Sequence, residues 1–327
     1  MPARRAAFSC RYNPLGVGRS LKPAKTEQRN PRSRGLDRKS TLEILRALNG
    51  EDARVAWSVR LELPKIARAV DAIVRSLQRG GTLFYVGAGT SGRLAVVDAS
   101  ECPPTFGTPP TMVRAIIAGG ERALRHAVEG AEDSTTNGAR DLRRAGMLRR
   151  DVVVGLAASG TTPYVLGAIE FAQKRGAVTV GVTSNPRSPL ARRSQIAIAP
   201  ETGPEAIAGS TRLKAGTAQK MVLNLLSTAA MIRLGRVYET WMVHVALTNQ
   251  KLRRRAARIL EEAAGVSLSA AEHALRQAEH DLPAALVMLK TRASLYEARR
   301  RLEVSHGNVR QAIEMKQKWG VDAKGRS

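Results

Sequence analysis

The amino-acid sequence predicts an α/β protein in which a parallel sheet lies between two layers of helices. Residues 82–86 and 151–156 are short apolar stretches typical of buried parallel strands, and each is followed by a turn rich in small and hydroxyl residues. A helical pattern follows each turn, and further strands are expected at 177–183 and 195–199. This alternation is typical of a three-layer sheet, so the two loops that follow strands share one edge.

Local signals place several helices around these strands. Ser40 followed by Glu43 predicts a hydroxyl cap at the start of an early helix, and apolar periodicity predicts a helix over 64–78. Two more helices are expected at 164–174 and 215–234. These elements supply the outer layers of the predicted fold.

The C-terminal part is expected to be helical. Three N-terminal caps are predicted, at Ser269 with Glu272, at Asp281 ahead of Pro283, and at Ser294 with Glu297. These caps imply a small helical subdomain over 265–315, after a main domain over 26–264. Residues 1–25 are basic and show no periodic pattern of apolar residues, so we expect a disordered tail there. We expect residues 316–327 to form a second tail.

Composition narrows the class of protein. The chain has 327 residues, of which 43% are apolar and only 4% aromatic, which suits an Ala-, Val- and Leu-rich core. Cys10 and Cys102 are its only cysteines, which is too few for a disulfide framework and favours a reducing compartment. Neither a membrane span nor a secretory signal is found, so we expect a cytoplasmic protein.

The chain is strongly basic, with 53 Lys and Arg against 28 Asp and Glu. The excess is spread over the N-terminal tail and exposed helix faces, and no zinc-finger, basic-zipper or RNA-binding aromatic pattern accompanies it. We therefore expect no nucleic-acid partner. A small anionic substrate fits the charge equally well.

The first glycine-rich loop, Gly87 to Gly92, matches the dinucleotide fingerprint G-x-G-x-x-G after a strand. A nicotinamide site also needs an acidic residue about 20 positions later to hold the ribose. Residues 103–118 contain no Asp or Glu, so the dinucleotide interpretation is disfavoured.

A phosphate site built from two loops is the better interpretation. Thr90 and Ser91 in the first loop, and Ser159, Thr161 and Thr162 in the second, place hydroxyls beside helix N-termini that bind phosphate dianions. Ser210, Thr211 and Lys214 supply a possible third wall. The alternative is that these small residues only form tight turns and cap helices.

Two carboxylates are candidates for proton transfer. Glu101 precedes Pro103 and Pro104, which are expected to end the preceding helix, and Glu132 lies in a polar segment that contains Gly130. Taken alone, either could be an ordinary surface charge. No histidine pair has metal-ligand spacing and no G-x-S-x-G motif is present, so neither a metal site nor a serine hydrolase is expected.

Several longer segments together resemble the N-acetylmuramic acid 6-phosphate etherase family. They are residues 84–94, 98–105, 117–121, 127–133, 157–165, 209–220 and 231–238, in the family's order. The resemblance covers nearly the whole chain after the first 25 residues. It implies a sugar-isomerase (SIS) type domain with five parallel strands, a C-terminal helical subdomain and a homodimer.

The resemblance also implies a reaction. Members remove the D-lactyl ether from N-acetylmuramic acid 6-phosphate, leaving N-acetylglucosamine 6-phosphate and D-lactate, without metal or organic cofactor, in cell-wall amino-sugar recycling. The family's two functional glutamates fall on Glu101 and Glu132. We expect Glu132 to act as the base on the C2 hydrogen and Glu101 as the acid to the departing lactate, although the roles could be exchanged.

Three positions depart from the family pattern. Thr161 stands where Arg is frequent, His244 where Asp is frequent, and Gln250 where Glu is usual. Two other functions stay open. One is a non-catalytic sugar-phosphate sensor, because the glucokinase regulatory protein is similar in its sugar-binding domains, and the other is a sugar-phosphate isomerase.

Overall fold

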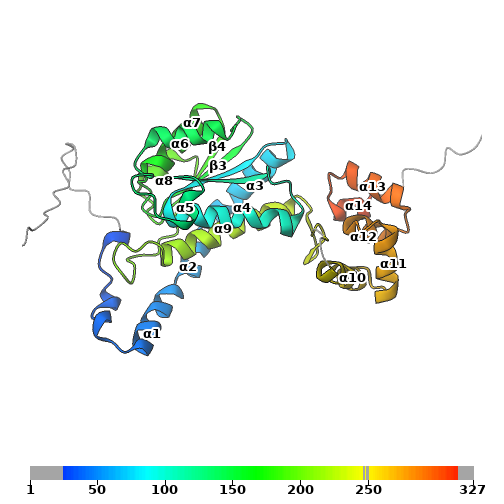
Figure 1. Cartoon of the computed structure of the whole chain (residues 1–327), viewed down its shortest axis with the longest axis horizontal. Coiled ribbons are helices and arrows are strands. Elements are labelled where there is room, and N and C mark those ends of the chain that lie inside the picture. Colours follow the sequence, from blue (N-terminus) through cyan, green and yellow to red (C-terminus); the bar gives the residue numbers. More distant parts are fainter. Residues whose placement is uncertain (1–24, 246, 248–249, 316–327) are drawn as a thin grey trace, which may run out of the picture.

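The computed structural model describes residues 25–245, 247 and 250–315, which form two packed units (Figure 1). The first is a five-stranded sheet with helices on both faces, and the second is a group of short helices at the C-terminal end. The predicted fold class is thereby confirmed. Residues 1–24 and 316–327, where tails are predicted, lie outside the described residues.

The five-stranded sheet is parallel, with the strand order β2-β1-β3-β4-β5. Its strands are β1 (Leu83–Gly87), β2 (Val113–Ile117), β3 (Val152–Leu156), β4 (Val178–Val182) and β5 (Ile196–Ile198). Every residue of β1 and β3 is buried, because both faces of the sheet are covered. Four strands lie where the sequence predicts them. The edge strand β2 is the one that the sequence did not predict, because its middle residues are only partly buried and Arg114 interrupts its apolar pattern.

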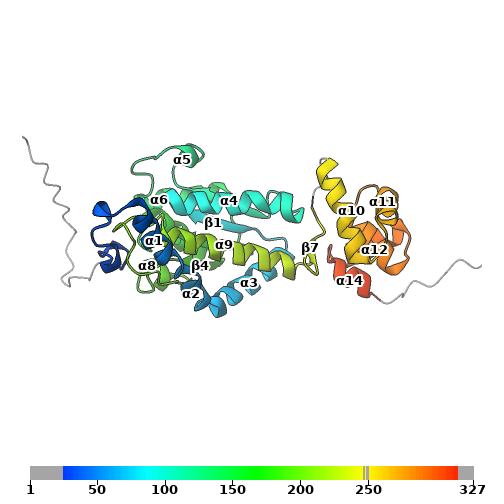
Figure 2. The same cartoon turned by 90° about the horizontal axis from the view of Figure 1, so that it is seen from below.

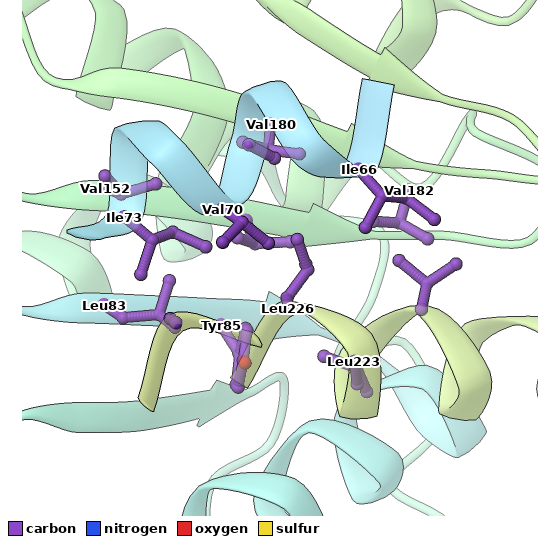
Figure 3. Close-up of a cluster of buried hydrophobic side chains, with 14 of the residues drawn as sticks. Ile66, Val70, Ile73, Leu83, Tyr85, Val152, Val180, Val182, Leu223 and Leu226 are labelled. Carbon is purple, nitrogen blue, oxygen red and sulfur yellow. The ribbon is translucent and has the colours of Figure 1, made fainter. Parts of the chain in front are cut away.

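Different helices cover the two faces of the sheet. α3 (Leu63–Gln78), α4 (Gly89–Phe106) and α9 (Lys214–Arg233) pack on one face. α6 (Thr135–Arg144), α7 (Pro163–Lys174) and α8 (Pro189–Arg193) pack on the other. Figure 3 shows Ile73 of α3 and Leu226 of α9 in one buried cluster with Leu83 and Tyr85 of β1 at the first face. Replacing Ile73 with Ala would cost about 2–5 kcal/mol of stability.

The N-terminal segment forms an arm, residues 25–61, that extends beside the sheet unit (Figure 1). It contains three short 3₁₀ helices, η1 (Lys25–Glu27), η2 (Pro31–Ser33) and η3 (Leu36–Arg38), followed by α1 (Thr41–Asp52) and α2 (Val55–Arg60). The predicted capping box at Ser40 and Glu43 is confirmed at the start of α1. Large apolar side chains remain exposed on the arm, including Trp57, which is 61% exposed.

A short hairpin of β6 (Val237–Tyr238) and β7 (Trp241–Met242) connects the sheet unit to the C-terminal helices. These are α10 (Gln250–Ala264), α11 (Leu268–Gln277), α12 (Leu282–Thr291), α13 (Leu295–Val304) and α14 (Val309–Glu314). Their apolar side chains form a cluster separate from the two clusters of the sheet unit. α10 contributes Leu260 to this cluster, so we propose that the helical unit begins before α10 rather than at residue 265.

The predicted caps of the helical unit are correct in two places and wrong in one. Asp281 and Ser294 cap α12 and α13. Ser269 lies inside α11, whose cap is Ser267, because α10 ends at Gly265 with a left-handed φ of 71° and the next helix follows at once. Within the described part of the chain, no helix is both long and apolar enough to cross a membrane.

Candidate active site

A crevice is expected where β1 and β3 lie side by side at the centre of the sheet. The chain leaves β1 for α4 on one face and leaves β3 for α7 on the opposite face, so the loops after these strands diverge. In open parallel sheets, ligands bind at this switch point, outside the carboxyl ends of the strands. Both predicted phosphate loops therefore lie at this switch point.

The first loop brings the N-terminus of α4 close to the sheet. A Cβ at Gly87 would lie 2.7 Å from the nitrogen of Gly92, and a Cβ at Gly92 would lie 2.5 Å from a side-chain carbon of Ile117, so this close approach requires glycine at both positions. Thr90 and Ser91 lie in the first turn of α4, which has no side-chain cap. First-turn N–H groups have no partner inside a helix, so they can bind an external anion.

The second loop gathers hydroxyls at the N-terminus of α7. The Ser159 and Thr161 hydroxyls lie 2.8 Å apart, and the Thr161 N–H also donates to Ser159 Oγ. Thr162 is the N-cap residue of α7, but its side chain makes no capping hydrogen bond. Gly160, with φ of 72°, packs so closely that a Cβ would lie 2.2 Å from Ser188 Oγ. The loop is thus held firmly while its hydroxyls stay at the edge of the sheet.

The third segment, around the N-terminus of α9, adjoins the first loop but differs in its chemistry. Thr90 Cγ2 would lie 3.6 Å from a Cβ at Gly216, which places the first turn of α9 against Thr90. The fully buried carboxylate of Glu205 accepts the N–H groups of Lys214 and Ala215, at 3.0 and 2.9 Å. The protein's own carboxylate thus occupies the N–H groups that an external anion would use at this helix.

Lys214 itself is turned away from solvent. Its ammonium group forms an ion pair with Glu51 of α1, and both side chains are almost completely buried. Burial raises the pKa of Glu51, but hydrogen bonds from Lys214 and Asn30 and the charge of Arg32 outweigh it and lower the pKa below its usual value. The structure gives Lys214 a partner within the protein. Its contact with substrate stays a prediction, as do those of the half-buried Ser210 and Thr211.

Glu132 lies beside the second loop. It follows α5 (Arg122–Arg125) in an irregular segment, and its backbone carbonyl accepts the N–H of Tyr164 in the first turn of α7 at 3.0 Å. Close packing of α6 and α7 fixes this position, because a Cβ at Gly138 would lie only 1.9 Å from the carbonyl oxygen of Tyr164. The side chain of Glu132 is exposed.

Glu101 lies further along α4, away from the first loop. It is exposed on α4, ten residues beyond Ser91, which corresponds to about 15 Å along the helix axis. Pro103 and Pro104 do not end α4, as the sequence suggested, because they lie in its final turn and the helix continues to Phe106. Gly107, with a left-handed φ of 59°, terminates it. Within one chain, Glu101 is therefore separated from the first phosphate loop by most of the length of α4.

A buried network that sequence reasoning missed holds α4 in place. Asp98, one turn before Glu101, accepts hydrogen bonds from Tyr85 at 3.0 Å, Asn224 at 2.9 Å and Ser227 at 3.1 Å. Burial raises the pKa of Asp98, and the hydrogen bonds oppose that rise. This network joins α4 to β1 and α9. The only sequence feature that could have indicated this network is an acidic residue on the side of α4 that faces the core.

The fold and these loops define an α/β protein in which two hydroxyl-bearing loops follow neighbouring parallel strands at the switch point of the sheet. Residues 65–173 match the family described as the glucokinase regulatory protein N-terminal SIS domain, and residues 135–229 match the SIS domain. The chain belongs to the N-acetylmuramic acid 6-phosphate etherase family. A protein of that name from Yersinia pestis (strain Pestoides F) is 53% identical over 288 residues, covering 88% of this chain and 98% of that protein.

A second relative and a solved structure are also similar to this chain. An N-acetylmuramic acid 6-phosphate etherase from Yersinia pseudotuberculosis serotype O:1b (strain IP 31758) has the same identity and coverage. A phosphoheptose isomerase structure from Francisella tularensis aligns with a TM-score of 0.49 and 20% identity, covering 59% of this chain and 100% of that one. Family membership rests on the relatives of high identity and does not depend on this weaker likeness.

Proposed function

We propose that the protein is a carbon–oxygen lyase that cleaves the D-lactyl ether of N-acetylmuramic acid 6-phosphate. The products are N-acetylglucosamine 6-phosphate and D-lactate, and the reaction serves the recycling of cell-wall amino sugars. The observation that carries this proposal is the 53% identity to etherases over 98% of their length. Both candidate glutamates are present, and two helix N-termini at the crevice can hold the phosphate.

The reaction follows from the chemistry of the open-chain sugar. The ether oxygen at C3 is β to the C1 aldehyde, so the C2 hydrogen is acidic. Glu132 takes the C2 proton, the C3–O electron pair leaves with lactate, and Glu101 protonates that oxygen. Water then adds at C3 and a proton returns to C2, which gives N-acetylglucosamine 6-phosphate. Each positioned acid or base contributes about 10²- to 10⁴-fold.

A second copy of the chain completes the site in this proposal. With the phosphate at Ser91, a glutamate about 15 Å along α4 is out of reach of the same sugar's lactyl oxygen. In an isologous dimer, the α4 helices of the two copies pack against each other through the same face and run antiparallel. Val97, which is 57% exposed, lies between Arg93 and Glu101 at helical spacing. Among the described residues, Arg93 donates only to backbone carbonyls, those of Leu124 and His126, so its charge is left to attract Glu101 of the other copy. Glu101 of one copy then approaches the phosphate loop of the other.

The N-terminal arm supports assembly independently. Its exposed apolar side chains are Leu42, Leu45, Trp57 and Leu61, each more than half exposed. Such a group of apolar side chains is typical of a surface that is covered by a partner. We also propose a cytoplasmic location, because Cys102 is a free, buried thiol that needs no oxidising compartment.

The direct experiment is to incubate the purified protein with N-acetylmuramic acid 6-phosphate and measure D-lactate and N-acetylglucosamine 6-phosphate. Equal release of both products is expected, without added metal or nucleotide. The match to the glucokinase regulatory protein SIS domain keeps a sensing role as the second candidate. Tight sugar-phosphate binding with no lactate release would support the sensor and contradict the etherase.

A further inference from the structure

A cavity lies at the junction of the sheet unit and the helical unit, away from the phosphate loops. It has a volume of about 550 Å³ and is lined by the ends of α3 and α9, by Met112 before β2, and by residues between α13 and α14. Figure 2 shows α14 and the β6–β7 hairpin next to the end of α9. The phosphate loops lie at the opposite end of α9, which is 20 residues long, or about 30 Å.

The lining of this junction cavity is basic. Arg233 and Arg236 enter it from the end of α9, and His306 faces them from the helical unit. Among the described residues that line the cavity there is no Asp or Glu. Gln78, Ser305, Asn308 and Gln311 add neutral polar groups. Such a combination of guanidinium groups and neutral polar groups suits a carboxylate or a phosphate.

Arg236 carries the argument, because its charge has no partner among the described residues. Within the described part of the chain its side chain makes neither a hydrogen bond nor an ion pair, although it is half-buried and burial lowers its pKa. An uncompensated charge in such a place is costly. The nearby Arg310 shows the contrast, since it pairs with Glu239 and Glu314 and lies over the ring of Tyr238.

The residue next to Arg236 does not neutralise it. His244 is held by a hydrogen bond of 2.9 Å between its Nε2 and the carbonyl of Gly307. Burial and the charge of Arg236 lower the pKa of His244 to about 4, so the ring is neutral at pH 7. A carboxylate at position 244 would have paired with Arg236 from inside the protein. With His there, the described residues supply no negative charge to Arg236.

We propose that the junction cavity binds a small oxyanion, the carboxylate or phosphate group of a metabolite, with Arg236 as its principal partner. The bound anion connects the end of α9 to the α13–α14 turn and so fixes the helical unit against the sheet unit. This site is separate from the crevice and does not depend on the etherase proposal.

The test measures thermal stabilisation of the full chain by inorganic phosphate or by D-lactate, against chloride at equal ionic strength. A Ser91→Ala/Ser159→Ala background weakens phosphate binding in the crevice. One or both anions should stabilise this background protein, and the stronger one identifies the ligand as a phosphate or a carboxylate. Arg236→Gln should weaken that anion's binding about tenfold or more, whereas Arg310→Gln should leave it unchanged.

Two further variants separate a binding role from a structural one. Without added anion, Arg236→Gln should be at least as stable as its parent, because it removes an unpaired charge. His244→Asp should abolish the anion effect, because it supplies an internal carboxylate beside Arg236. The proposal is overturned if neither anion stabilises the protein, if Arg236→Gln binds as tightly as its parent, or if it loses stability without anion.

Discussion

Lys214 and Glu51, which are 163 residues apart in the sequence, form a buried ion pair that ties the N-terminal arm to the first turn of α9. Both side chains are at most 4% exposed. Asn30 and Arg32 also donate to the Glu51 carboxylate, each at 2.8 Å. The charge of Glu51 is therefore compensated in the folded protein by groups from the arm and from α9.

Glu51→Gln should destabilise the protein by about 3–5 kcal/mol, because it leaves the Lys214 ammonium buried without a counter-charge. Chemical denaturation of the full chain measures this loss. Glu201→Gln is the matched control, since its pair with Lys25 is exposed and should contribute less than about 1 kcal/mol. Equal losses in both variants would contradict a special role for the buried pair.

His244 should make the protein less stable as pH falls from about 6.5 to 4. Its pKa is lowered to about 4 by burial and by the charge of Arg236, so between these values the unfolded chain binds a proton that the folded chain does not. The free energy of unfolding thus rises with pH through this window, by up to about 1.4 kcal/mol per pH unit. His244→Gln should flatten the dependence of thermal midpoint on pH. The exposed His126, changed to Gln, should not.

Glu132→Gln should lower lactate release by about 10² or more while substrate binding survives, because the amide cannot accept the C2 proton. In deuterated water, the wild-type product should carry deuterium at C2. Glu101→Gln should also block lactate release but permit slow C2 exchange. Exchange that persists in Glu132→Gln and vanishes in Glu101→Gln would mean that the two roles are reversed.

Mixing inactive Glu101→Gln and Glu132→Gln proteins under conditions of subunit exchange should restore lactate release. If each site takes one glutamate from each copy, half of the sites in a mixed dimer are intact, which gives about a quarter of wild-type activity for random pairing. If both glutamates of a site came from one chain, every site would lack one of them. No recovery in a proven mixed dimer would therefore refute the shared site.

The sequence predicts the fold well where signals are local. Short apolar runs before glycine and hydroxyl turns place β1 and β3, and Ser40 with Glu43 places the start of α1. The end of α4 was misplaced because two prolines can occupy a last helical turn whose terminating signal is Gly107.

The site is predicted only in part, because its remaining features depend on distant contacts. Lys214 in a Gly-Ser-Thr-Arg-Leu-Lys segment suggests a phosphate ligand, and only the folded chain brings Glu51 to it. The separation of Glu101 from the phosphate loop likewise depends on α4 continuing without a break.

Glu205 decides which helix ends are open to an anion in the proposed site. Its carboxylate already accepts the first N–H groups of α9, so that helix end is occupied from inside the protein. The first turns of α4 and α7, which have no side-chain cap, are left to hold the phosphate. In the proposed site the phosphate is therefore held between two helices that pack on opposite faces of the sheet.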